Sequence, residues 1–306
     1  MTLTRFPKTS TAGTGTLMAC AAMCCVQLGL AASVGLAGRL GPDGVAWLRL
    51  AWAAVIIVAV ARPWKVSFDR ATIGILVLLG VATAGMTLGF MFAVQTIPLG
   101  TASALEFLGP LSVAVAQGRG RARWWALVAA VGVLLLTEPW QGATDPLGVL
   151  CALGAAVCWA AYVLLTQKAG DAVSGISALG MSMPVAAVVA SLAVGPAVLG
   201  NMDWQLLAIG FALALLLPVI PFSLELSALR RLTTAAFGTL MCLEPAIAVV
   251  VGLMLLHQVP RPAAVIGIGL VIAAGIGATR SGERVVPVDE PVAAAPLSPV
   301  AADRAS

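Results

Sequence analysis

The chain has 306 residues, of which 60% are hydrophobic and 10% are charged; its formal net charge is +4 and its mean hydropathy is +1.03. Soluble domains carry roughly 25% charged residues, so a water-soluble particle of this composition could not cover its surface. The composition excludes a soluble enzyme and predicts an all-α integral membrane protein.

Apolar segments suited to spanning a bilayer follow one another along the chain. A spanning helix needs roughly 20 apolar residues, and Gly, Pro and charged residues separate ten such segments, the fifth of which is short. They cover residues 15–36, 44–61, 72–94, 99–117, 124–137, 148–166, 176–199, 204–229, 233–256 and 262–279. Residues 1–14 form an N-terminal tail. Residues 281–306 mix Pro, Ala and acids without periodicity, so we expect a disordered C-terminal tail.

Basic residues are unevenly divided between the two sets of loops. With the N-terminus inside, all but three of the 17 Lys and Arg residues fall in inside segments. The three others are Arg39 and Arg261 in outside loops and Arg49 within a helix. Because basic loops stay in the cytoplasm, the asymmetry predicts a multi-pass protein of the cytoplasmic (inner) membrane with both termini in the cytoplasm.

A weak internal repeat relates the two halves of the chain. At an offset of 135 residues, Pro110 falls on Pro245 and Gly132 falls on Gly267. The repeats then cover residues 15–137 and 148–279, with five helices each. An odd number of helices per repeat gives the two repeats opposite orientations. Inverted repeats are typical of secondary transporters, in which the substrate site lies between the repeats near the middle of the bilayer.

Two charged residues of the first repeat are candidates for this site, since charges within the membrane are costly and usually functional. Arg49 could clamp a carboxylate, extend to the outer interface, or pair with a glutamate. Glu106 precedes Pro110, and a proline cannot donate to the carbonyl four residues earlier, which is that of Glu106. An interrupted helix favours a transporter site; the alternative is a packing kink with Glu106 paired to Arg49.

Two glutamates of the second repeat are further candidates. Glu244 has no basic neighbour in its own segment, so it could carry a coupling proton or make a single interhelical hydrogen bond. Glu225 precedes Arg230 and Arg231, so it is either a gate-side ion-pair partner or part of a solvated helix end. Uncharged side chains that could line a cavity, or only pack, are Gln27, Phe107, Trp159, Tyr162 and Phe222.

The motifs of several other protein classes are missing. There is no GxxxxGK[ST] loop, so we do not expect ATP as the direct energy source. The six cysteines lie in apolar segments without metal-ligand spacing. A membrane-embedded lipid-modifying enzyme would need a cluster of His, Asp or Ser at the interface, and a channel would need a continuous polar stripe. We therefore expect no catalytic residue, no cofactor, no metal and no nucleic-acid partner.

Five segments carry specific motifs: GVAWLRLAWA, VQTIPLGTASALEFLGPLSVAV, CALGAAVCWAAYVLLTQKAG, PFSLELSALRRL and FGTLMCLEPAIAVVVG. Through them the chain, from about residue 15 to 279, resembles the EamA-type carriers of the drug/metabolite transporter superfamily. The resemblance implies a ten-helix inner-membrane exporter of small amino acids such as threonine or homoserine, driven by the proton gradient. Matching polar positions are Gln27, Arg49, Gln95, Glu106, Glu225 and Glu244. His257-Gln258 departs from the Gly-Glu pair usual in such carriers.

The residues and the resemblance together favour proton antiport by alternating access, with an amino acid, protons and the lipid bilayer as partners. In this hypothesis Arg49 meets the substrate carboxylate, and Glu106 or Glu244 meets the ammonium group. The alternative is the same fold exporting another small solute, such as a drug cation or a nucleobase. The sequence sets neither the substrate nor the oligomeric state.

Overall fold

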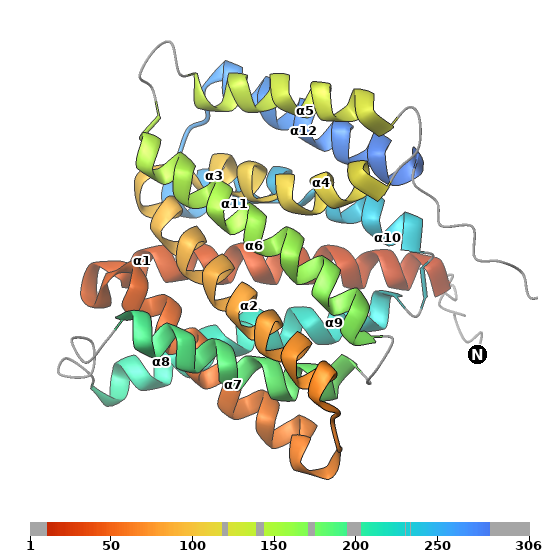
Figure 1. Cartoon of the computed structure of the whole chain (residues 1–306). Helices are drawn as coiled ribbons and strands as arrows, with labels where there is room; N and C mark the ends of the chain where they lie inside the picture. Colours follow the sequence, from red (N-terminus) through yellow and green to blue (C-terminus); the bar gives the residue numbers. More distant parts are fainter. Residues whose placement is uncertain are drawn as a thin grey trace, which may run out of the picture.

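The computed structural model describes residues 11–117, 122–138, 144–170, 175–194, 203–229, 231–232 and 234–281, which are helical apart from short connections. Figure 1 shows the helices gathered in one bundle. By length and composition, five helices could cross a membrane, and shorter apolar helices accompany them. Large apolar side chains such as Leu192 and Val157 are exposed. Long helices with so apolar an exterior define an integral membrane protein.

The helices of the N-terminal part follow the predicted segments closely. Their bounds are α1 (Thr11–Ala61), the short 3-10 helix η1 (Pro63–Lys65), α2 (Arg70–Thr96), α3 (Leu99–Glu106), α4 (Leu108–Gln117) and α5 (Ala122–Thr137). Helix α1 begins at Thr11, within the predicted tail of residues 1–14. Residues 1–10 lie outside the described part of the chain.

The C-terminal part continues in the same way. Its elements are α6 (Pro146–Gly170), α7 (Gly175–Val194), α8 (Trp204–Ala214), the π-helical segment η3 (Leu215–Val219), α9 (Ile220–Leu229), α10 (Thr234–Met241), α11 (Glu244–Leu256) and α12 (Pro262–Ser281). The end of the predicted segment 176–199 lies outside the described residues. Of the predicted disordered tail, 281–306, only Ser281 is described, and it is the last residue of α12.

Helix α1 contains the reversal that the sequence predicts between its first two segments. Gly41 has φ 74° and ψ 161°, a conformation open to glycine and not to other residues without strain. Pro42 follows and begins the next helical stretch. The helical stretches on either side of Gly41, which are the two arms of α1, therefore extend almost to the turn. The observed break is shorter than the predicted gap over residues 37–43. Figure 1 shows α1 folding back on itself.

Three segments predicted as single helices are interrupted in the structure, and each break has the same cause. Helix α3 ends at Glu106, α8 ends at Ala214 and α10 ends at Met241. Each of these residues lies four positions before a proline, namely Pro110, Pro218 and Pro245. A proline ring removes the N–H that would bond to that carbonyl and clashes with it. The interruptions at Glu106 and Met241 are those that Pro110 and Pro245 predict from the sequence, whereas a single uninterrupted helix over 204–229 was wrong.

Two helices begin at aspartates that accept hydrogen bonds from the first turn. The backbone N–H of Thr72 donates to Asp69 at 3.3 Å, and that of Leu206 donates to Asp203 at 2.7 Å. Hydrogen bonding from Thr72 lowers the pKa of the exposed Asp69 carboxyl. Such caps satisfy amide groups that a helix start leaves without partners.

Small residues allow the helices to approach closely. Helices α5 and α12 lie side by side at the top of Figure 1. At their contact, a Cβ added to Gly132 would lie 2.8 Å from the carbonyl oxygen of Gly267, and the converse distance is 2.6 Å. Since lipid gives no hydrophobic drive between helices, close backbone packing of this kind holds membrane bundles together.

Candidate functional site

The broken helices place two of the predicted glutamates at helix ends inside the bundle. Glu106 is the last residue of α3, and Glu244 is the first residue of α11. Both side chains are partly buried, and they interact electrostatically with each other. The prolines therefore expose backbone polar groups at the same places where the chain carries carboxyl groups.

Gln27 of α1 joins this cluster. Its Nε2 donates to Oε1 of Glu244 at 3.3 Å. Gln27 is completely buried, and its Oε1 has no hydrogen-bond partner among the described residues. A buried acceptor without a partner is costly, so the site is incomplete without a donor.

Arg49 is also buried, with only 8% of its surface exposed, which contradicts the hypothesis that it extends to the outer interface. One terminal nitrogen donates to the Ser33 hydroxyl and to the Met91 sulfur, each at 3.4 Å. Its Nε has no partner within the described ranges. No ion pair to Glu106 within 4.0 Å occurs there either, although the two charges interact at longer range. Arg49 therefore keeps donor capacity for another acceptor.

Glu225 of α9 extends the cluster. It interacts electrostatically with Glu244 on α11 and with Tyr162 on α6. The cluster thus contains the carboxyl groups Glu106, Glu225 and Glu244 and one guanidinium, that of Arg49. This excess of acidic groups means that the site can bind protons or a cationic group.

The predicted aromatic residues lie beside the cluster on α6. Trp159 packs edge-to-face on Phe107, with ring centroids 6.4 Å apart and an interplanar angle of 78°. Phe107 occupies the break between α3 and α4. Tyr162 packs near Leu76 and Leu79 of α2 and hydrogen-bonds to the Thr166 side chain. Trp159 therefore supports the interrupted helix, and Tyr162 faces Glu225. The side chain of Phe222 lies outside the described part.

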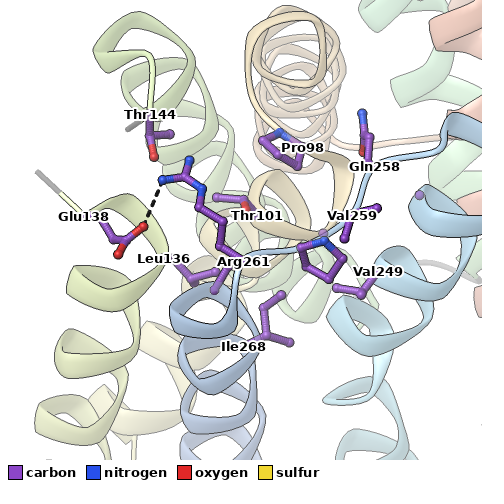
Figure 2. A pocket seen from close by; sticks show the side chains of 14 residues that line it. Pro98, Thr101, Leu136, Glu138, Thr144, Val249, Gln258, Val259, Arg261 and Ile268 are labelled. Atoms are coloured by element: carbon purple, nitrogen blue, oxygen red, sulfur yellow. Dashed lines mark hydrogen bonds and ion pairs between the residues drawn. The ribbon is translucent and has the colours of Figure 1, made fainter. Parts of the chain in front are cut away.

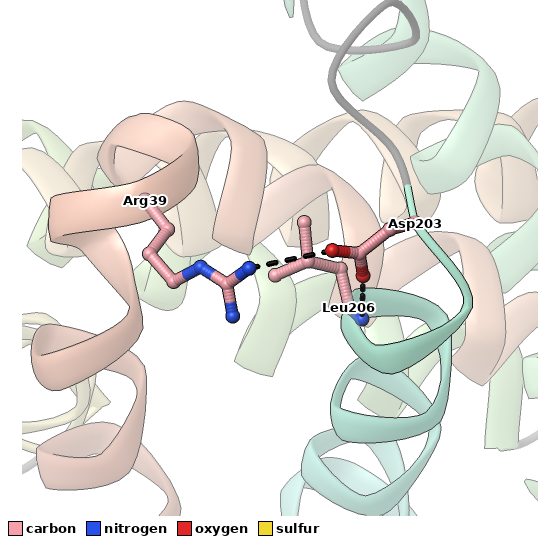
Figure 3. A network of polar contacts seen from close by, with 3 residues as sticks. All are labelled: Arg39, Asp203 and Leu206. Atoms are coloured by element: carbon pink, nitrogen blue, oxygen red, sulfur yellow. Dashed lines mark hydrogen bonds and ion pairs between the residues drawn. The ribbon is translucent and has the colours of Figure 1, made fainter.

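The sequence did not predict two ion pairs, which lie near helix ends away from the central cluster. Arg39 pairs with Asp203 at 3.3 Å, beside the cap that Asp203 provides for α8 (Figure 3). Arg261 pairs with Glu138 at 2.9 Å. These partners are 164 and 123 residues apart in the chain, so no local pattern could reveal them.

Gln258 explains the departure from the usual Gly-Glu pair. Its Oε1 accepts a hydrogen bond of 2.9 Å from the backbone N–H of Leu99, at the start of α3. The preceding His257 ends α11 in a left-handed conformation with φ 54°, where glycine is the usual residue. Gln258 therefore connects the end of α11 to the start of α3.

A small cavity of about 50 Å³ lies next to this contact (Figure 2). Its walls come from α3, α11, α12 and the end of α5. Polar groups in its lining include Thr101, Glu138, Gln258 and Arg261.

A membrane bundle with interrupted helices that carry charges at their breaks is the architecture of a secondary transporter. A model of the EamA-like transporter family matches residues 146–279. The threonine/homoserine exporter RhtA of Escherichia coli (strain K12) is 37% identical over 265 residues, covering 84% of this chain and 88% of that protein. The RhtA of Salmonella typhimurium (strain LT2) is 36% identical over 263 residues with the same coverage. The chain belongs to the EamA-like transporter family.

A solved structure shares the fold. A crystal structure with 17% sequence identity aligns with a TM-score of 0.58, covering 88% of this chain and 99% of that chain. The alignment extends through both halves of the present bundle, so that protein shares the arrangement of α1 to α12.

Proposed function

We propose that this protein exports small amino acids across the cytoplasmic membrane in exchange for protons. The observation that carries the proposal is the buried cluster of Gln27, Arg49, Glu106 and Glu244 at the helix breaks. Two buried atoms of this cluster have no hydrogen-bond partner among the described residues, and both suit an amino acid. Nε of Arg49 is a donor for the carboxylate, and Oε1 of Gln27 is an acceptor for the ammonium group. The names of the relatives favour threonine and homoserine.

The exporter works as two inverted five-helix repeats with ten spanning segments. The offset of 135 residues found in the sequence relates the observed helices: α3 (Leu99–Glu106) maps onto the bounds of α10 (Thr234–Met241) residue for residue. Both helices end four residues before a proline. This correspondence supports a common origin of the two halves.

Helix contacts support the same symmetry. Under the offset, α6 corresponds to the first arm of α1, and α11 corresponds to α4. The pair α4 and α6 is in contact, and so is its counterpart, α1 and α11. The pair α5 with α12 joins corresponding helices directly. Such reciprocal contacts are expected of a pseudo-two-fold axis in the membrane plane, around which alternating access takes place.

Protons are the coupling ion. Three carboxylates and one guanidinium leave an excess of negative charge in an apolar interior, and binding a proton reduces this excess at low cost. Substrate binding with its ammonium group near Glu106 and Glu244 would release that proton. Glu225, the member of the cluster on α9, then serves as the gate on the cytoplasmic side. Both termini lie in the cytoplasm, as the basic residues indicate.

The test is uptake of labelled amino acids into inverted membrane vesicles that contain the full chain, measured against vesicles without it. We expect uptake of threonine and homoserine and little uptake of bulky or acidic amino acids. Uptake of a drug cation or nucleobase, and of no amino acid, would contradict the proposed substrate class while keeping the transporter.

A further inference from the structure

We propose that the cavity between α3, α5, α11 and α12 is a second amino-acid site, an exit site on the outer side, in which Glu138 receives the ammonium group and Arg261 the carboxylate. This proposal rests on the function proposed above. Its two charged residues, Glu138 and Arg261, belong neither to the sequence motifs nor to the central cluster.

The cavity lies at the outer end of the two helices that carry the central carboxyls. Thr101 lines the cavity and precedes Glu106 by five residues on α3, which is about 7.5 Å along the helix. Val249 lines it from α11, and it follows Glu244 by five residues, again about 7.5 Å. The same two helices therefore lead from the central cluster to the cavity.

Helices α3 and α11 are in close contact at the wall of the cavity. Gly100 of α3 packs directly on Val249 of α11, with no room for a Cβ. Gln258 adds its hydrogen bond to the N–H of Leu99 at the same level. Separating α3 from α11 at this contact would connect the cluster with the cavity.

The cavity has a pair of opposite charges that matches a zwitterion. Glu138 and Arg261 contact each other at 2.9 Å, as drawn in Figure 2. An amino acid carries an ammonium group and a carboxylate about one carbon apart. It can therefore replace this ion pair by two new ones, giving each protein charge a partner of the opposite sign.

Glu138 is more deeply buried than Arg261, so Arg261 is the partner that moves when a substrate binds. The Glu138 side chain is 10% exposed and that of Arg261 is 49% exposed. Half of the Arg261 side chain is already exposed to water, whereas Glu138 would stay behind as a buried, unpaired charge if Arg261 moved away. Movement of Arg261 away from Glu138 is therefore rare in the empty protein, and it becomes favourable when the substrate ammonium group takes the place of the guanidinium.

Two further features fit a site that is closed when empty. The volume of about 50 Å³ holds a few water molecules and no amino acid, so the movement of Arg261 also supplies space. Glu138 has φ 38°, a left-handed conformation that is costly for a residue with a side chain. Strained backbone of this kind is kept where the surroundings hold a ligand-binding group in place.

The experiment measures protection of a cavity residue by external substrate. Thr101→Cys is placed in the full chain with its six native cysteines replaced, and right-side-out vesicles are treated with an impermeant thiol reagent. Threonine at about ten times its dissociation constant should slow labelling by about tenfold. Threonine amide and N-acetylthreonine, which each lack one charge, should protect far less.

Glu138→Gln should abolish this protection. Arg39→Gln is the matched control, since it breaks the other outer ion pair, which does not line this cavity, and should leave protection intact. Thr144→Cys, a second lining position, repeats the test should Thr101→Cys not reach the membrane.

Three results would overturn the exit site: no labelling at either position, labelling without protection, or equal protection in the Glu138→Gln variant, which would place the effect at the central cluster. These outcomes are distinct from failure of the proposed function. In that case the unaltered protein would take up no labelled amino acid in inverted vesicles.

Discussion

Arg49 donates to Ser33 and Met91, while Glu106 faces it at a longer distance. The sequence places both residues within the membrane but leaves open whether they form a structural pair. The contacts favour separate tasks, because Arg49 is held by neutral partners and keeps an unused Nε. A structural ion pair would instead satisfy both groups and leave nothing for a substrate.

Glu106→Gln should therefore abolish export while the protein still reaches the membrane at normal abundance. The amide keeps the shape of the side chain but can neither bind the coupling proton nor attract an ammonium group. We expect uptake into inverted vesicles to fall to the level of vesicles without the protein.

The double variant Glu106→Gln with Arg49→Gln separates the two explanations. If Glu106 only balanced the charge of Arg49, removing both charges would restore export, since an unpaired buried charge is what costs stability. We expect no restoration. Near-normal export by Glu106→Gln alone would remove Glu106 from the site and make Glu244 the better candidate.

At the scale of elements, the proline breaks create the ends on which the candidate residues lie. Pro110→Ala should return an amide to the carbonyl of Glu106, join α3 with α4 and turn the Glu106 side chain away from Glu244. Export should fall at least severalfold, measured against membrane abundance.

Pro184→Ala is the control for this change. Pro184 lies inside α7, which continues unbroken around it. Its replacement should leave export close to normal. Equal losses in both variants would mean that proline affects folding in general and not the site in particular.

The contact between α5 and α12 gives a second prediction at this scale. Gly267→Ala would place a Cβ against the backbone of Gly132. Overpacking of this kind costs about 1–3 kcal/mol, so the melting temperature in detergent should fall. Gly269→Ala, on the same helix with nothing within 4 Å of its added Cβ, should leave it unchanged. A larger fall for Gly269→Ala would contradict the close packing of α5 on α12.

The sequence predicts the elements better than their interactions, for a physical reason. Apolar length, glycine and proline act locally, so the helices, the turn at Gly41 and the weakness at Glu106 could be read from the chain. The bond from Gln27 to Glu244 joins residues 217 positions apart. Glu138 and Arg261 are also far apart in the chain, and only tertiary packing brings these two residues together. The partners of Arg49 were missed because serine and methionine are ordinary residues in such helices.

At the scale of the whole molecule, the distribution of basic residues predicts the orientation in the membrane, and exposed loop residues can test it. Val259 is 80% exposed in the connection before α12, and Ser67 is exposed in the connection between η1 and α2. In right-side-out vesicles and a Cys-free background, Val259→Cys should react with an impermeant thiol reagent and Ser67→Cys should not. The reverse pattern would invert the assigned topology and would turn the proposed exit site into an entry site.

Exchange of an amino acid for protons is the central claim, and reconstituted protein tests it most directly. Liposomes containing the purified full chain are loaded with threonine, clamped at zero membrane potential, and diluted into threonine-free buffer while a trapped dye reports the internal pH. Antiport predicts that threonine leaves as protons enter, so the interior acidifies, and that the Glu106→Gln protein shows neither flux. Threonine efflux without a change of internal pH, or with alkalinisation, would contradict the account.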